Sequence, residues 1–184
     1  MAQLLFQPLH LRADGGLRQP DPVMFLEYWN RPDAMESSFT NDGWFRTGDV
    51  AVLQGDLLHI VDRVKDLIIR GGHNIHPARI ENLALKHPAI LKAAAFAVAD
   101  KRLGEKVCLA VILREGATVE PGVLLDHLFE VGLSKFDMPE FFIAMDAFPL
   151  TASGKILKRE LVEWVRAGRI APAPCRWVDP KKRA

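Results

Sequence analysis

The sequence contains few cysteines, and this excludes several classes of protein. Of its 184 residues only Cys108 and Cys175 are cysteines, which cannot build a disulfide framework. No Cys-x-x-Cys pair is present for zinc binding or redox chemistry, and we expect no metal site. Cys108 lies in the apolar run KVCLAVIL, where we interpret it as a small buried hydrophobic residue.

An excess of one charge and a long apolar run are also lacking. The formal net charge is +1, which gives no electrostatic reason to expect nucleic acid or an anionic membrane as a partner. No apolar stretch approaches the length of a transmembrane helix. The N-terminal segment MAQLLFQPLHLRAD lacks the basic start and uninterrupted apolar run of a signal peptide. We therefore predict a cytoplasmic protein.

The composition is that of a folded protein, with 49% hydrophobic and 26% charged residues. Residues 1–62 are predicted to be rich in β-structure. Apolar segments at 50–53 and 57–61 flank Gly55-Asp56, a hairpin signature, and residues 31–39 contain one short helix. Because few long apolar elements occur here to close a core, we expect this segment to be the C-terminal remnant of a larger domain.

From residue 63 the pattern changes to alternating strands and helices. We predict strands at 67–70, 93–98, 107–113 and 141–145, and helices at 77–85, 121–131 and about 155–167. The last helix carries an apolar stripe of Leu157, Leu161 and Val165, which indicates a core-facing side. The prediction is a compact α+β domain at 63–170, followed by a tail at 171–184.

Asp49, in the first segment, and Arg63, where the pattern changes, are the first candidate functional residues. Asp49 follows Thr47-Gly48, and an acid in this position is either a simple turn residue or a carboxylate presented to vicinal hydroxyls. Arg63 belongs to the charged run DRVKD, so it is either a solvated surface charge or a residue at a domain junction.

A second candidate is the segment GGHNIHP, which begins at Gly71 and Gly72. His73 and His76 lack a third metal ligand, so we do not expect a metal ion here. Two interpretations of the glycines remain open. They form a turn with positive φ, or they mark a place where the backbone passes close to a thin ligand.

The third candidate is Lys155, in the segment FPLTASGKILKREL. The segment does not match the phosphate-binding P-loop, because no glycine lies five residues before Gly154 and Ile156 replaces the required Ser or Thr. A lysine after a flexible Thr-Ala-Ser-Gly stretch is suited instead to reach a site built elsewhere. Its ammonium can bridge a carboxylate and a phosphate as negative charge builds between them.

These segments resemble the C-terminal motifs of the adenylate-forming superfamily, and most nearly those of the AMP-forming acyl-CoA synthetases. The motifs are GWFRTGD at 43–49, DRVKDLIIRGGHNIHP at 62–77 and PLTASGK at 149–155, preceded by YWNRP at 28–32. They occur in the family's order over almost the whole chain. The resemblance implies the small C-terminal domain of that fold, with a short hairpin and a three-stranded sheet flanked by helices. A β-rich piece of the large domain's barrel would precede it.

The resemblance also implies an activity and its substrates. Such enzymes form an acyl-adenylate from ATP and a carboxylic acid, with release of pyrophosphate, and then transfer the acyl group to coenzyme A. By resemblance, Asp49 would hold the ribose hydroxyls of ATP or AMP, with Arg63 assisting. Lys65 would be the hinge about which the small domain rotates between the half-reactions, and Lys155 would act in adenylation.

By the same resemblance, Gly71 and Gly72 would line the tunnel of the pantetheine arm. The sequence departs from the family at Glu27, Arg79 and Ala99, all at peripheral positions. It also lacks the family's phosphate loop, adenine-pocket motif and magnesium-binding glutamate. We therefore expect the C-terminal portion of a synthetase, as a fragment or truncated reading frame, which is inactive without a large N-terminal adenylation domain. Mg²⁺ would bind through that domain.

One alternative from another class remains open. The chain is either this part of a ligase or a stand-alone binding or regulatory module that keeps the fold without the chemistry. The presence of Asp49, Lys65 and Lys155 favours the ligase. The sequence does not identify the carboxylic acid, fatty or aromatic. Exposed strands in the first segment would allow self-association.

Overall fold

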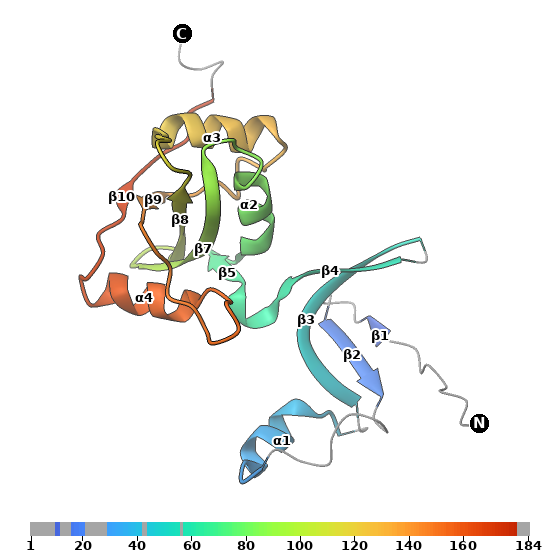
Figure 1. The fold of residues 1–184 in the computed structure, drawn as a ribbon. Coiled ribbons are helices and arrows are strands. Elements are labelled where there is room, and N and C mark those ends of the chain that lie inside the picture. Colours follow the sequence, from blue (N-terminus) through green and yellow to red (C-terminus); the bar gives the residue numbers. More distant parts are fainter. Residues whose placement is uncertain (1–9, 12–15, 21–28, 42–43, 56, 180–184) are drawn as a thin grey trace. The chain divides into compact units, whose positions relative to one another are not determined.

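The computed structural model describes residues 10–11, 16–20, 29–41, 44–55 and 57–179. The chain divides into two compact units, residues 1–65 and residues 66–184. The boundary predicted from sequence, between residues 62 and 63, lies three residues before this division. Figure 1 shows the fold of both units, with most helices and strands labelled.

The first unit is built on an antiparallel sheet with the strand order β1-β2-β3-β4. Its strands are β1 (His10–Leu11), β2 (Gly16–Pro20), β3 (Trp44–Gln54) and β4 (Leu57–Arg63). The predicted hairpin is confirmed: Gln54 pairs with Leu57 across a two-residue loop, in which Gly55 has a φ of 59°. The short helix is confirmed as α1 (Pro32–Ser38), which has proline in its first turn.

The second unit has a mixed sheet flanked by helices, so the predicted α+β class is confirmed. The long strands β7 (Ile90–Asp100) and β8 (Gly104–Leu113) pair antiparallel, and β8 pairs in parallel with β9 (Phe141–Ala144). A short hairpin of β5 (Ile68–Arg70) and β6 (His73–Ile75) joins the sheet where Arg70 pairs with Gly104. The predicted short hairpin and three-stranded sheet are therefore present.

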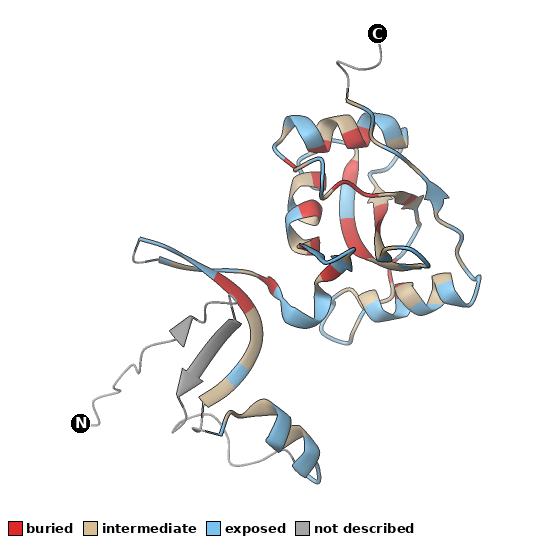
Figure 2. Cartoon of the chain, turned by 180° about the vertical axis from the view of Figure 1, so that it is seen from behind, coloured by how far each residue is buried: buried red, intermediate tan, exposed pale blue. Residues whose placement is uncertain are grey.

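Successive side chains of β7 and β8 point to opposite faces of this sheet, and each face packs into a hydrophobic core. On one face, Ala93, Ala95, Val107, Leu109 and Val111 pack with buried residues of α2 (Pro77–Ala84) and α3 (Pro121–Glu130). On the other face, Ala94, Phe96, Cys108 and Ala110 pack with Leu161 of α4 (Lys158–Arg166). Buried residues accordingly run through the sheet and the inner sides of the helices (Figure 2). The two faces explain why both strands are apolar at every position over most of their length.

Three details differ from the sequence prediction. Helix α4 begins at Lys158, three residues after the predicted start at Lys155. The strand β6 has no apolar pattern and was not predicted. The expected tail contributes β10 (Ala173–Pro174), which pairs antiparallel with β9, and Trp177 packs against the core that includes residues of α2 and α3.

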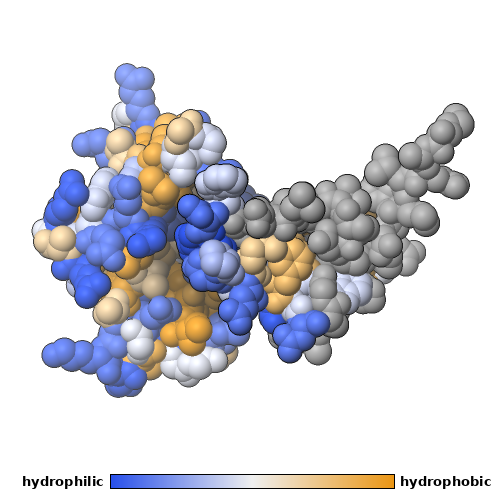
Figure 3. Space-filling view, turned by 90° about the horizontal axis from the view of Figure 1, so that it is seen from below, coloured by the Kyte–Doolittle hydropathy of each residue, from blue (hydrophilic) through white to orange (hydrophobic). Residues whose placement is uncertain are grey.

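On the face of the second unit that Figure 3 shows, hydrophilic side chains surround a patch of hydrophobic ones.

Candidate functional site

Asp49 and Arg63 lie opposite each other on β3 and β4. They are direct partners in the register, and Arg63 Nε donates a hydrogen bond to Asp49 Oδ1 at 3.1 Å. The backbone N–H of Asp49 donates to Thr47 Oγ1 at 3.1 Å, next to Gly48 with a φ of 76°. Among the described residues no group donates to Asp49 Oδ2. The pair therefore presents a carboxylate oxygen to hydroxyl donors, with a cation beside it.

Lys65 lies at the division between the two units. It belongs to a three-residue 3₁₀ helix, η1 (Val64–Asp66), and its side chain is exposed. The first unit ends at this residue and the second begins at Asp66. A short 3₁₀ segment is a frequent connector between elements.

Gly71 and Gly72 form the two-residue turn of the β5–β6 hairpin. Their φ values are 58° and 85°, which is the left-handed pair that a type I′ turn requires. The Gly71 N–H donates to the Leu103 carbonyl at 2.8 Å, and a Cβ at Gly71 would lie 3.3 Å from Leu103 Cδ2. A Cβ at Gly72 would meet no atom within 4 Å. The turn is thus fixed on one side at Gly71 and open at Gly72, so a ligand can approach the backbone there.

Lys155 lies on a tight turn before α4, and this corrects the expected flexible mount. The Thr151 N–H donates to the Lys155 carbonyl at 2.8 Å, and the Lys155 N–H donates to Thr151 Oγ1 at 3.0 Å. Leu150 and Ile156 form an isolated antiparallel bridge, and Gly154 has a φ of 81°. The Lys155 side chain is exposed and makes no hydrogen bond or ion pair with the described residues. The ammonium is therefore displayed on a closed turn.

Glu81 links its own helix α2 to β7 and to Lys158, which lies three residues after Lys155. Its Oε1 accepts the Ala95 N–H of β7 at 2.7 Å and the ammonium of Lys158, the first residue of α4, also at 2.7 Å. The side chains of Glu81 and Lys158 are 17% and 22% exposed, so the pair is largely shielded from water. The sequence does not reveal this role, because Glu81 occupies a position of the helix where any polar residue would fit the pattern.

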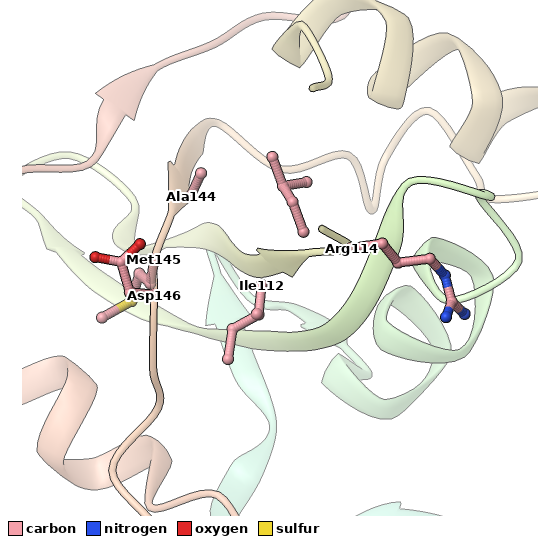
Figure 4. Close-up of a pocket in the computed structure, with 6 residues that line it drawn as sticks. Ile112, Arg114, Ala144, Met145 and Asp146 are labelled. Carbon is pink, nitrogen blue, oxygen red and sulfur yellow. The ribbon is translucent and has the colours of Figure 1, made fainter. Parts of the chain in front are cut away.

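The histidines and a cavity of the second unit lie apart from the candidate residues. No three His, Cys, Asp or Glu side chains group as metal ligands in the described part of the chain. A cavity of about 340 Å³ lies where β8 and β9 end, lined by Ile112, Leu113, Arg114, Ala144, Met145 and Asp146 (Figure 4). None of the candidate residues Lys155, Gly71 or Gly72 lines it.

Cys108 is fully buried, which confirms its interpretation as a small core residue. Burial raises the pKa of its thiol, which therefore stays protonated and unreactive. In the chain as far as it is described, no helix combines the length and apolar character that a membrane crossing needs. Four positions that the sequence motifs include, Glu27, Tyr28, Gly43 and Asp56, lie outside the described residues.

Comparison with known proteins gives consistent relatives. Residues 79–155 match the family described as "AMP-binding enzyme C-terminal domain". The chain is 39% identical over 156 residues to the zebrafish (Danio rerio) "Medium-chain acyl-CoA ligase ACSF2, mitochondrial", covering 83% of this chain and 25% of the relative. The chain thus spans about a quarter of the length of that protein.

Solved structures of similar proteins agree with this family match. An o-succinylbenzoate CoA synthetase from Bacillus subtilis, in complex with its acyl-adenylate intermediate, is 34% identical with a TM-score of 0.76, over 84% of this chain and 33% of that one. ATP-bound MatB from Rhodopseudomonas palustris is 34% identical with a TM-score of 0.74, over 81% and 30%. The chain therefore carries the AMP-binding enzyme C-terminal domain at residues 79–155 and is similar over most of its length to the C-terminal portion of AMP-forming acyl-CoA ligases.

Proposed function

We propose that this chain is the mobile C-terminal part of an acid–thiol ligase, which activates a carboxylic acid with ATP and transfers the acyl group to coenzyme A. It acts with a large N-terminal adenylation domain, which supplies the acid pocket, most of the ATP site and the Mg²⁺ ligands. A cytoplasmic location stays a prediction, and the name of the zebrafish relative places that protein in mitochondria.

One observation carries the proposal: a single small unit displays two different ligand-facing features. Lys155 presents an ammonium without a partner among the described residues on a closed turn. The Gly71-Gly72 turn offers exposed backbone with open space at Gly72. An exposed cation on a closed turn and exposed backbone at a glycine turn each offer a contact to a ligand, so the two features together favour a domain that serves two chemical steps.

In the first step, a carboxylate oxygen attacks the α-phosphorus of ATP and the bond to pyrophosphate breaks. Negative charge builds on the α-phosphate oxygens and on the leaving pyrophosphate, while the entering carboxylate gives up its charge to the new bond. The Lys155 ammonium stabilises this charge as a compact donor of three hydrogen bonds. Asp49 and Arg63 hold the ribose, with the carboxylate accepting hydrogen bonds from both hydroxyls.

In the second step, the thiol sulfur of coenzyme A attacks the acyl carbonyl carbon and AMP leaves. The thin pantetheine arm reaches that carbon past the Gly71-Gly72 turn, where the lack of side chains leaves room. Lys65 is the hinge that lets the second unit present first Lys155 and then the glycine turn. The acid differs between a medium-chain acyl-CoA ligase and an o-succinylbenzoate CoA synthetase, so its identity depends on the large domain.

The test compares the 184-residue chain with a fusion of this chain to the large domain of a homologous ligase. Acyl-adenylate is measured by pyrophosphate release, and thioester formation is measured from supplied acyl-adenylate. We expect both half-reactions in the fusion and neither in the chain alone. Activity in neither protein, with binding of AMP or a protein partner by the chain alone, would support the non-catalytic module instead.

A further inference from the structure

We infer that Arg70 and His73, the residues that flank the glycine turn, are positioning residues for the thiol-transfer step, and that they hold the turn by clamping it to residues 134–140. The inference rests on the proposed function for its kinetic consequence. Its structural half stands independently, on contacts within the second unit.

Arg70 makes the stronger half of the clamp. Its Nη1 donates to Glu140 Oε1 at 2.6 Å and to the Met138 carbonyl at 3.4 Å, and its Nη2 donates to the Phe136 carbonyl. The Arg70 side chain is only 15% exposed. A planar guanidinium can satisfy three acceptors of one loop at once, which a lysine at this position cannot do with the same geometry.

Glu140 is itself fixed to the sheet. Its Oε2 accepts the Val107 N–H at 2.9 Å, and its own N–H donates to the Val107 carbonyl at 2.9 Å. The carboxylate therefore bridges β8 and Arg70. Because β8 is a central strand with neighbours on both sides, the arginine is tied to the most rigid part of the unit.

His73 makes the other half from the opposite strand of the hairpin. Arg70 and His73 face each other across the turn, and His73 Nε2 lies 2.8 Å from Asp137 Oδ1. The Asp137 side chain is 17% exposed, and its N–H donates to the Ser134 carbonyl at 2.9 Å. Both ends of the two-residue turn are thus attached to the same loop, so neither end is free to shift alone.

A second support lies beneath the turn at Leu103. The Gly71 N–H donates to the Leu103 carbonyl, and the N–H of Leu103 donates to Asp100 Oδ1 at 2.9 Å. Asp100 is held by Lys106 of β8, with Nζ at 2.6 Å from Oδ2. The glycine turn therefore has two supports, the contact with Leu103 and the clamp of Arg70 and His73.

This arrangement matters because glycines confer no rigidity of their own. A two-glycine turn has more conformational freedom than any other, and a ligand passing along it needs one fixed backbone path. Misplacement of a positioning element by about 1 Å can reduce a rate about 100-fold. The contacts of Arg70 and His73 restrict the backbone of the turn, which the two glycines do not restrict by themselves.

The structural test uses the 184-residue chain and amide hydrogen exchange measured by NMR. Arg70→Gln should speed exchange of the Gly71 and His73 amides by about tenfold or more, because the turn opens locally. Arg114→Gln is the matched control, since Arg114 also donates to a carbonyl, that of Pro88 at 3.1 Å, at the other end of β8. The Ala110 amide reports whether the fold is intact, and Asp137→Asn, which keeps the side-chain shape, provides a milder second variant. Unchanged exchange at the turn in both variants would overturn the inference.

The kinetic test uses the fusion protein. Arg70→Gln should slow thioester formation from supplied acyl-adenylate by about 100-fold while adenylation changes by less than about threefold, and Arg70→Lys should recover only part of the rate. Equal loss in both half-reactions would show that the clamp is merely structural. If the unmodified fusion makes no thioester, the proposed function fails, whereas faster exchange at the turn still assigns the clamp to Arg70.

Discussion

Replacing Lys155 with alanine separates its chemistry from its structural role. In the fusion protein, Lys155→Ala should suppress acyl-adenylate formation and largely spare thioester formation from supplied acyl-adenylate. Removing one preorganised charge from a water-poor site costs about 3–4 kcal/mol in the transition state, which is about 100- to 1000-fold in rate. Measuring both half-reactions in single turnovers gives the ratio directly.

The position of Lys155 indicates that the loss of acyl-adenylate formation does not arise from unfolding. The side chain of Lys155 is exposed and unpaired among the described residues, and the turn is closed by backbone groups and by Thr151. Truncation should therefore change the free energy of unfolding by no more than about 0.5 kcal/mol. Lys92→Ala, at another exposed lysine of the same unit, is the control and should leave both rates unchanged. Equal damage to both half-reactions by Lys155→Ala would refute the role.

Four further predictions follow from other parts of the chain. Gly72→Leu should block thioester formation more than adenylation in the fusion, since φ is 85° and the space beside it is open to the ligand. Glu81→Gln keeps an acceptor for the sheet but weakens the ion pair to α4, so urea denaturation should show a loss of about 1–3 kcal/mol. The pKa of His87 lies below its ordinary value, first because the ring is desolvated by burial and second because His127 repels a positive charge on it. The two ring centroids are 4.9 Å apart. The native state therefore disfavours protonation of His87. The melting temperature should therefore fall as pH drops below about 6.5, and His87→Gln should flatten that dependence. Strands β2, β3 and β4 should exchange their amide hydrogens quickly in a dilute monomer and more slowly at high concentration if edge strands associate. Slow exchange of these strands in the dilute monomer would show that their sheet folds alone.

The sequence predicted the elements whose pattern is strong and long. The apolar runs at 93–98 and 107–113 identified β7 and β8, although pairing along the whole hairpin extends β7 to Ile90–Asp100. The polar strand β6 and the proline-containing β10 carry no such pattern. They exist because a neighbouring strand supplies hydrogen bonds, which is a tertiary effect that local preference does not reveal.

The start of α4 shows why a helical stripe does not fix a boundary. Leu157, Leu161 and Val165 have helical spacing, yet the helix begins only at Lys158. The Thr151 hydroxyl accepts the Lys155 N–H, which offers the backbone an alternative to the first helical turn. The resemblance identified Lys155 and the two glycines, but Arg70 and Glu140 were not found, because they are brought together only by the order of strands in the sheet.

The closed turn at Lys155 changes how the lysine must move between the two steps. The sequence suggested that a flexible stretch lets it arrive and leave, but four hydrogen bonds join residues 151–155 within the turn. A side chain on so rigid a mount leaves the site only if the mount itself moves. The whole second unit is the smallest body that can carry it, since α4 is tied to α2 and β7 through Glu81. The segment that can absorb this motion is the short 3₁₀ connection at Lys65, where the two units divide, and this supports the proposed hinge.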